Sequence, residues 1–336
     1  MTPATELLSE HPFAPFVRIL GKGKAGTRSL SRQEAHQAFA MILAGEVEQL
    51  QLGAFLMLLR VKEESGEELA GFVDACRAVL PPTQSLPRAD LDWSSYAGKR
   101  SQNPWFILSI LLLAEAGHSV FIHGSAGHTK GRLYTEQAWQ ALGLPIATGW
   151  QQASTSLTVQ RVCYMPLAHI CPALEDIMQL KSLLGLRSPV NTLARMVNPL
   201  RCASSIQSIF HPAYGRLHQE ADRLLGQPRS IVFKGDGGEV EVKPQADTRL
   251  MLLEGTGFQE RVLPRTIDTR IAGEETLSTE PLRKLWRGEQ SNTYGLEATL
   301  ATATVGLLAV ESDLSPMQAR AQAEDLWQNR NRNTLH

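Results

Sequence analysis

The chain has 336 residues, of which 43% are hydrophobic and 20% are charged, and its formal net charge is −1. This length exceeds what one ordinary domain needs, so we expect two packed units in a soluble globular protein. Residues 1–15 contain glutamates and prolines in place of the basic and apolar parts of a secretory signal. The longest apolar run, Trp105–Ala114, is too short to span a bilayer. The sequence therefore favours a cytoplasmic protein without a membrane partner.

Neither the cysteines nor the total charge identifies a function. No two of the four cysteines have the spacing of a zinc or redox motif, so we expect reduced, buried thiols and no metal site. The charge is unevenly distributed, however. Residues 93–234 hold 13 Lys and Arg against 6 Asp and Glu, whereas both flanking stretches are acidic. A basic centre indicates an anionic partner, unless these charges simply scatter over a solvated surface.

The first third of the chain predicts helices. Ser31 and Glu34 form a capping box, in which each side chain bonds a backbone N–H that would otherwise lack an acceptor. Apolar residues then recur at helical spacing in three successive stretches up to Cys76. Three prolines within 80–92 predict a linker that ends this helical part.

After the linker, short buried strands alternate with helices. Asn103 and Pro104 are expected to cap an apolar helix over 105–116. We expect strands at Val120–Ile122, Val162–Met165, Ser230–Lys234 and Arg249–Leu253, and helices at 135–142, 298–309 and 316–327. Such alternation predicts a mostly parallel sheet with helices on both faces. The fold class is therefore α/β, with a small all-α domain at the N-terminus.

Two stretches have a distinctive spacing. The first contains Gly45-Glu46, an Ala-Phe-Leu helix within Gln51–Arg60, and Lys62 followed by Glu67-Glu68-Leu69. The second contains Leu184-Gly185-Leu186-Arg187, then Asn191 and Asn198-Pro199-Leu200. Together with His123-Gly124, both resemble the anthranilate phosphoribosyltransferase family (glycosyltransferase family 3) over nearly the whole chain.

The resemblance implies a domain organisation. A helical domain over residues 1–80, completed by a returning segment at about 176–195, is hinged to a large α/β domain over 81–175 and 196–336. The resemblance also implies a homodimer formed through the helical domains.

The chemistry of this family requires a glycine-rich loop whose backbone N–H groups cradle phosphates. Counted back from Asn103, that loop is residues 93–98 here, and only Gly98 matches. Side chains at the other former glycines would block the close backbone approach. What remains resembles a vestigial substrate site made of Gly98, Asn103, His123, Gly124 and Asn191.

The magnesium-binding Asp-Glu pair of the family is not kept either. Residues 235–241 contain Asp236, Glu239 and Glu241, but no adjacent pair of acids. Any of the three could stand in, although a turn after a strand is the favoured interpretation. We therefore expect no catalytic residue and no cofactor, with magnesium required only if transferase activity survives.

Cations are concentrated where the family binds its substrates. No acidic residue occurs between Ile177 and Gln219, and Ala194-Arg195 replaces a Gly-Pro of the family. We expect eight cations to bind phosphate groups in an interdomain cleft, namely Lys99, Arg100, Lys130, Arg132, Lys181, Arg187, Arg195 and Arg201. The alternative is that several of them pair with carboxylates or lie along helices.

Short strings in the chain, among them Ser95-Tyr96 and Leu193-Ala194-Arg195, resemble the YbiB-like paralogues of the family. That group has degenerate phosphate loops and is associated with sequence-independent nucleic-acid binding. The resemblance implies a homodimer that binds single- or double-stranded nucleic acid in a basic interdomain cleft. Single strands would require a stacking face, for which Trp93, Tyr96 and Trp105 are candidates.

A second hypothesis is an active glycosyl or phosphoribosyl transferase with an altered substrate. It rests on the retained Asn103, His123-Gly124, Lys181, Arg187 and Asn191.

Overall fold

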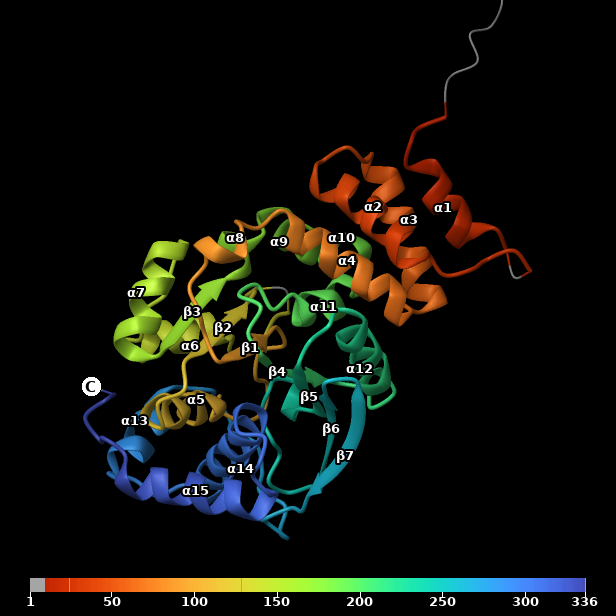
Figure 1. The fold of residues 1–336 in the computed structure, drawn as a ribbon. Helices are drawn as coiled ribbons and strands as arrows, with labels where there is room; N and C mark the ends of the chain where they lie inside the picture. Colours follow the sequence, from red (N-terminus) through yellow and green to blue (C-terminus); the bar gives the residue numbers. More distant parts are fainter. Residues whose placement is uncertain (1–9, 24, 128, 336) are drawn as a thin grey trace, which may run out of the picture.

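The computed structural model describes residues 10–23, 25–127 and 129–335 (Figure 1). Its N-terminal part is a helical bundle made of α1 (Ala14–Gly21), α2 (Arg32–Leu43), α3 (Gln49–Lys62) and α4 (Gly66–Ala78). The capping box of Ser31 and Glu34 begins α2, as the sequence predicts. The ring of Phe72 packs 5.1 Å from that of Phe39 and 6.2 Å from that of Phe55. The apolar stripes of the sequence therefore form the core of this bundle.

The remaining chain is built around one seven-stranded sheet in the order β3-β2-β1-β4-β5-β6-β7. Its strands are β1 (Leu91–Ser95), β2 (Val120–Gly124), β3 (Val162–Pro166), β4 (Ser204–Ile209), β5 (Arg229–Lys234), β6 (Thr248–Glu254) and β7 (Gly257–Leu263). The first five strands in this order are parallel, and β6 and β7 extend the sheet antiparallel. The predicted α/β class with a mostly parallel sheet is confirmed.

Helices cover both faces of the sheet (Figure 1). One face packs on α5 (Phe106–Glu115), α14 (Thr293–Val310) and α15 (Pro316–Asn329), while Ile122 points into this core. The adjacent Phe121 points into the other core, which it shares with the N-terminal bundle. α14 is long and apolar enough to cross a membrane by length and composition, but 78% of it is buried inside the fold, as is typical of a core helix.

The other helices connect these layers. They are η1 (Thr83–Ser85), α6 (Thr135–Ala141), α7 (Trp150–Gln160), α8 (Leu167–Ile170), α9 (Pro172–Gln179), α10 (Lys181–Leu184), α11 (Val190–Leu193), η2 (Ala194–Met196), α12 (Tyr214–Leu224), η3 (Asp236–Gly238) and α13 (Glu280–Arg287).

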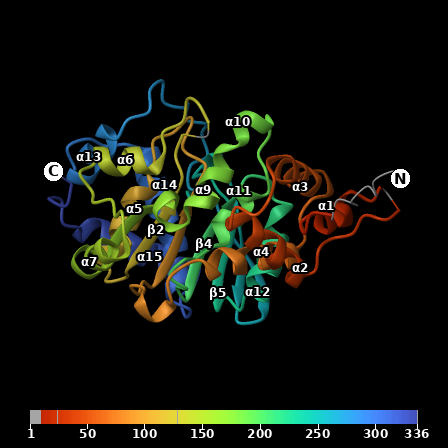
Figure 2. The same cartoon turned by 90° about the horizontal axis from the view of Figure 1, so that it is seen from above.

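The segment from α9 to α11 returns to the N-terminal bundle, and Figure 2 shows α9 and α11 beside α4. Leu174 and Ile177 of α9 and Val190 and Leu193 of α11 lie in the same apolar core as the bundle. The chain therefore crosses between the bundle and the sheet more than once, and the loops at the carboxyl ends of the strands face this returning segment.

Two local predictions are wrong. Residues 91–95 form a buried strand, although the sequence assigned them to the end of a linker and the start of a loop. Asn103 does not cap α5; its Oδ1 accepts a hydrogen bond from the Ser278 N–H at 2.8 Å. The Phe106 N–H at the start of α5 instead donates to the Glu241 carboxylate at 2.8 Å. A carboxylate distant in sequence has thus taken the place of the local cap.

Candidate functional site

The site lies where the parallel strands end. In open α/β sheets, ligands bind outside the carboxyl ends of the strands. At this edge the structure places the residues after β1 (96–100), β2 (125–127 and 129–134), β4 (210–213) and β5 (235–239). The returning segment and the end of α3 lie opposite them, and residues from both sides line one cavity.

The loop expected to bind phosphate already holds an anion of the chain itself. The backbone N–H of Ala97 donates to a Glu239 carboxylate oxygen at 2.6 Å, and the N–H of Gly98 donates to the same oxygen. The Ser95 hydroxyl donates to the other oxygen at 2.7 Å. Glu239 is only 1% exposed. Its carboxylate therefore satisfies the two amides that a phosphate would use.

The backbone conformation and the close neighbours of Gly98 both favour glycine at this position. Its φ is +70°, and a Cβ there would lie 3.1 Å from Arg132 and Tyr134 side-chain atoms. Gly124 is restricted in another way, since a Cβ would meet the Ser95 carbonyl oxygen at 2.2 Å. Both glycines permit close approach of backbones in this loop cluster.

Lys99 does not reach the cleft, so its assignment to the basic surface is wrong. Its ammonium is buried and forms ion pairs with Asp236 and Glu241. Burial raises the pKa of Glu241 to about 7, and the charge of Lys99 acts against this shift. Asp236, Glu239 and Glu241 are thus all committed to internal contacts. Among residues 10–23, 25–127 and 129–335, no group of three or more His, Cys, Asp or Glu side chains is arranged to hold a metal ion.

Four of the predicted cations do come together. The Lys181 ammonium donates to the Thr129 hydroxyl at 2.8 Å, and an Arg187 N–H donates to the same hydroxyl at 3.5 Å. Arg132 lies against the other side of this cluster, where it donates to the carbonyl oxygens of Ala97 and Gly98 at 3.0 and 2.9 Å. Burial lowers the pKa of Arg187, and the charge of Arg132 lowers it further.

Arg195 is the most buried of these four cations, with 8% of it exposed. It donates long hydrogen bonds to the Ser208 hydroxyl at 3.4 Å and the Gly238 carbonyl at 3.3 Å. Burial lowers the pKa of Arg195. The negative charge of Glu239 acts against this shift, whereas the positive charge of Arg187 adds to it. In the described part of the chain, Arg132, Arg187 and Arg195 form no ion pair with a carboxylate within 4 Å. These three guanidinium groups therefore have no carboxylate in direct contact, although the charge of Glu239 acts on Arg195 and raises its pKa.

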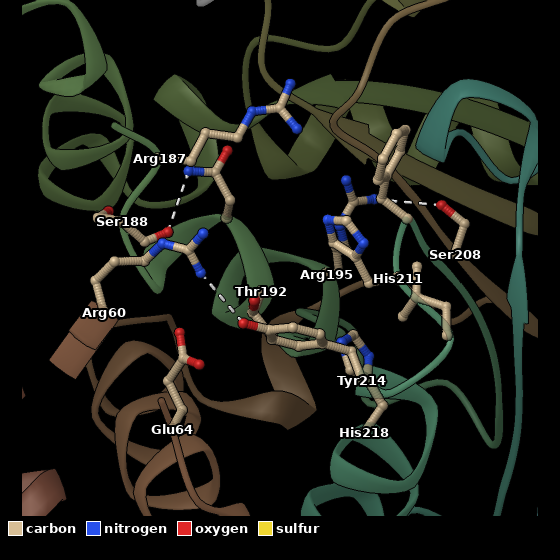
Figure 3. Close-up of a pocket in the computed structure, with 13 residues that line it drawn as sticks. Arg60, Glu64, Arg187, Ser188, Thr192, Arg195, Ser208, His211, Tyr214 and His218 are labelled. Carbon is tan, nitrogen blue, oxygen red and sulfur yellow. Dashed lines mark hydrogen bonds between the residues drawn. The ribbon is translucent and has the colours of Figure 1, made fainter. Parts of the chain in front are cut away.

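A cavity of about 150 Å³ opens between the two parts of the molecule (Figure 3). Figure 3 shows Arg60 and Glu64 from the helical bundle on one side, and Arg195, Ser208 and His211 on the sheet side. The guanidinium of Arg60 donates to the Tyr214 hydroxyl at 3.3 Å. The sequence does not predict Arg60 as a site residue, although it lies in the last turn of α3. We call Arg60, Arg132, Lys181, Arg187 and Arg195 the basic cluster.

Of the eight predicted cations, Arg187 and Arg195 line this cavity, and the other six do not. Arg100 and Lys130 are exposed on the loops that follow β1 and β2. Arg201 precedes β4, so it lies at the opposite edge of the sheet, and its assignment to the cleft is wrong. The exposed Arg201 side chain is therefore a useful control for charge at the cleft.

Most residues of the vestigial substrate site are buried in the fold, and one of them lines the cavity. His123 is buried, with its Nδ1 2.6 Å from the Tyr96 hydroxyl and its Nε2 3.2 Å from the Asp92 carboxylate. Asn103 is also buried and bonds the chain near Ser278. Of these retained residues only Asn191 lines the cavity, where its amide donates to the Ser188 carbonyl at 3.3 Å.

Comparison with known proteins identifies relatives over almost the whole chain. The model of the glycosyl transferase family helical bundle domain matches residues 16–79, and that of the a/b domain matches residues 107–330. The uncharacterized protein YbiB of Escherichia coli is 31% identical over 271 residues, covering 79% of this chain and 82% of that protein. Anthranilate phosphoribosyltransferase of Oceanobacillus iheyensis is 25% identical over 292 residues, covering 84% and 85% of the two chains.

Solved structures that are similar to this chain include anthranilate phosphoribosyltransferases. The enzyme of Thermus thermophilus superposes with a TM-score of 0.78 at 22% identity, covering 93% of this chain and 94% of that chain. The Saccharomyces cerevisiae enzyme in complex with PRPP and Mg has a TM-score of 0.76 at 15% identity, covering 95% and 94%.

Proposed function

The chain belongs to glycosyl transferase family 3, and on this fold we propose that it binds nucleic acid without regard to sequence, in the cleft that Arg60, Arg187 and Arg195 of the basic cluster line. The observation that carries the proposal is the convergence of cations at one cavity. Arg60, Arg187 and Arg195 line it together, and Arg187 and Arg195 lack carboxylate partners in the described structure. Glu64 is the one acid in the lining, and burial raises the pKa of its carboxyl, so cations dominate the cleft. A cleft in which one charge sign dominates focuses the field on an anionic ligand, and nucleic-acid affinity comes mainly from such phosphate contacts.

The state of the phosphate loop favours this proposal over phosphoribosyl transfer. A bound pyrophosphate needs free amides at the loop, but those of Ala97 and Gly98 already donate to Glu239. Magnesium needs oxygen ligands that face the substrate. Asp236 and Glu241 face the Lys99 ammonium instead, so the acids present do not fit the metal. The relatives named as anthranilate phosphoribosyltransferases support the transferase alternative by homology alone.

We also propose that the protein is a homodimer joined through its helical domains. α3 carries an apolar stripe of the exposed Leu50, Ala54 and Val61 and the half-buried Met57. These residues are spaced four, three and four apart and so share one helix face. Leu50 is 89% exposed and Val61 is 85% exposed. A contiguous apolar face of this kind is typical of a protein interface.

Fluorescence anisotropy with labelled oligonucleotides of unrelated sequences tests the binding proposal. We expect similar dissociation constants for all sequences, and a loss of affinity for Arg187→Glu that Arg201→Glu does not reproduce. The two variants change the net charge equally, so only the position of the charge differs. Equal losses in both variants, or a strong sequence preference, would contradict the proposal.

The transferase alternative has its own test in the same preparation. Pyrophosphate release from phosphoribosyl pyrophosphate is measured with a panel of aromatic amines and bases. We expect none above the rate without protein. Release that disappears in Asn103→Ala would overturn the assignment in favour of a transferase.

A further inference from the structure

The cavity of the basic cluster is continued by a second, larger one. The second cavity has a volume of about 720 Å³ and lies between the ends of β4, β5 and the start of β6. Ile209 and Phe210, at the end of β4, line both cavities. A ligand that is longer than one cavity would therefore have to pass Phe210.

Phe210 is an unusual residue to find at this position. It is 53% exposed, and it is the only phenylalanine, tyrosine or tryptophan in the described part of the chain that is classed as exposed. Its ring centroid lies 4.9 Å from that of the exposed His211, and the two rings are at 78°. The aromatic residues that the sequence suggested as stacking faces, Trp93, Tyr96 and Trp105, are all buried. Phe210 therefore provides the exposed aromatic face that those three residues lack.

Cations flank Phe210 on both sides. Arg187 and Arg195 line the first cavity, and Lys234 and Lys243 line the second. Lys234 and Lys243 are exposed and form no ion pair with a described carboxylate within 4 Å.

Acids and one further cation also line the second cavity. Asp236 pairs with Lys99, and Arg249 lies 3.6 Å from Glu260. The Asp247 carboxylate accepts a hydrogen bond at 3.0 Å from the backbone N–H of Arg265, which carries no charge. In the first cavity the one acid is Glu64, and burial raises the pKa of its carboxyl. Among the described residues, unpaired cations therefore outnumber unpaired acids along the two cavities.

We propose that Phe210 stacks on an unpaired base while the cations on its two sides hold the neighbouring phosphates, so that the ligand of this cleft is single-stranded nucleic acid. The inference rests on the proposed nucleic-acid binding and specifies its ligand. A positively charged groove with an exposed aromatic ring is the arrangement that binds single strands without sequence preference, because every base has a face to stack. The bases of an intact duplex stack on one another and leave no face for Phe210.

The test compares Phe210→Ala with wild type on a single strand and on a duplex of the same length. We expect Phe210→Ala to weaken single-strand binding by about 5- to 160-fold, which is the range for loss of one stacked base. Duplex binding should change by less than about twofold. Val262→Ala is the matched control, since Val262 is also exposed but lies on β7 away from both cavities.

Phe210→Trp adds a readout that does not depend on the alanine variant. Its exposed indole should retain single-strand affinity, and its fluorescence should be quenched by the single strand but not by the duplex. Unchanged single-strand affinity in Phe210→Ala, or equal losses on both ligands, would overturn the stacking role while nucleic-acid binding itself stands. Wild-type protein that binds neither ligand would overturn the proposed function as well.

Discussion

Replacement of Glu239 by alanine removes the anion that the chain places in its own phosphate loop. The N–H groups of Ala97 and Gly98 lose their acceptor, and the buried Arg195 loses the carboxylate charge that raises its pKa. Each buried N–H without an acceptor costs about 1–3 kcal/mol. We therefore expect Glu239→Ala to lower the free energy of unfolding by about 3–5 kcal/mol, in line with the loss of one partner from a buried charge contact. Glu239→Gln should lose less, because its amide oxygen can still accept.

Urea denaturation followed by circular dichroism measures this loss, with the exposed Glu275→Ala as the control. The same variant has a second signature. If the vacated amides bind an anion, inorganic pyrophosphate at ten times its dissociation constant should restore about 1.4 kcal/mol in Glu239→Ala. Wild type should not gain this amount at the same concentration. If Glu239→Ala lowered the free energy of unfolding by less than about 1 kcal/mol, the reasoning would be refuted. Removal of a buried carboxylate leaves its hydrogen-bond donors unpaired, which costs more than that.

Three further predictions concern other parts of the fold. Lys99→Met should destabilise the protein by about 3–5 kcal/mol in urea, since it leaves Glu241 buried without its partner; a neutral variant would contradict the ion-pair assignment. Burial lowers the pKa of His218 to about 3, so the unfolded chain binds the extra proton between pH 3 and the ordinary value of 6.5. The stability that His218 contributes is therefore lost as the pH falls, and the stability difference between wild type and His218→Gln should change by about 1.4 kcal/mol per pH unit from pH 6 to 4; a constant difference would show that His218 does not titrate this way. Leu50→Glu combined with Val61→Glu should halve the mass measured by light scattering, whereas a monomeric wild type would refute the dimer.

The fold could be predicted wherever the burial pattern follows hydrophobicity. The apolar stripes of the first helices and the strands β2, β3, β5 and β6 all have that pattern. The hydrophobicity pattern does not predict β1 and β4, because polar side chains occupy buried positions in these strands. Those side chains form hydrogen bonds with partners that are distant in the sequence. Ser204 donates to the Ala309 carbonyl at 2.7 Å, and Gln207 donates to the Asp222 carboxylate at 3.1 Å. A sequence pattern does not contain these partners.

The sequence predicts the positive charge of the candidate site, but it does not predict correctly which cations belong to it. The stretch without acids contains Lys181, Arg187 and Arg195, and these three do meet Arg132 at one place. Lys99 could not be excluded from the sequence, because Glu241 lies 142 residues further along the chain.

Two other residues show that the neighbouring sequence does not determine where a side chain lies in the fold. Arg201 belongs to the same basic stretch, but the direction of β4 carries it to the opposite edge of the sheet. The sequence predicts Glu239 in a turn after a strand, and only the tertiary fold brings its carboxylate to the amides of the phosphate loop. Charge composition indicates what a cleft attracts, whereas tertiary contacts decide which charges remain available.

The salt dependence of nucleic-acid binding tests the central claim most directly. The dissociation constant for one oligonucleotide is measured between about 50 and about 200 mM salt for wild type, Arg187→Ala and Arg201→Ala. The account predicts a steep linear dependence of log K on log salt for wild type, a slope smaller by about one in Arg187→Ala, and an unchanged slope in Arg201→Ala. Affinity that does not vary with salt, or a slope that Arg187→Ala leaves unchanged, would contradict binding in this cleft.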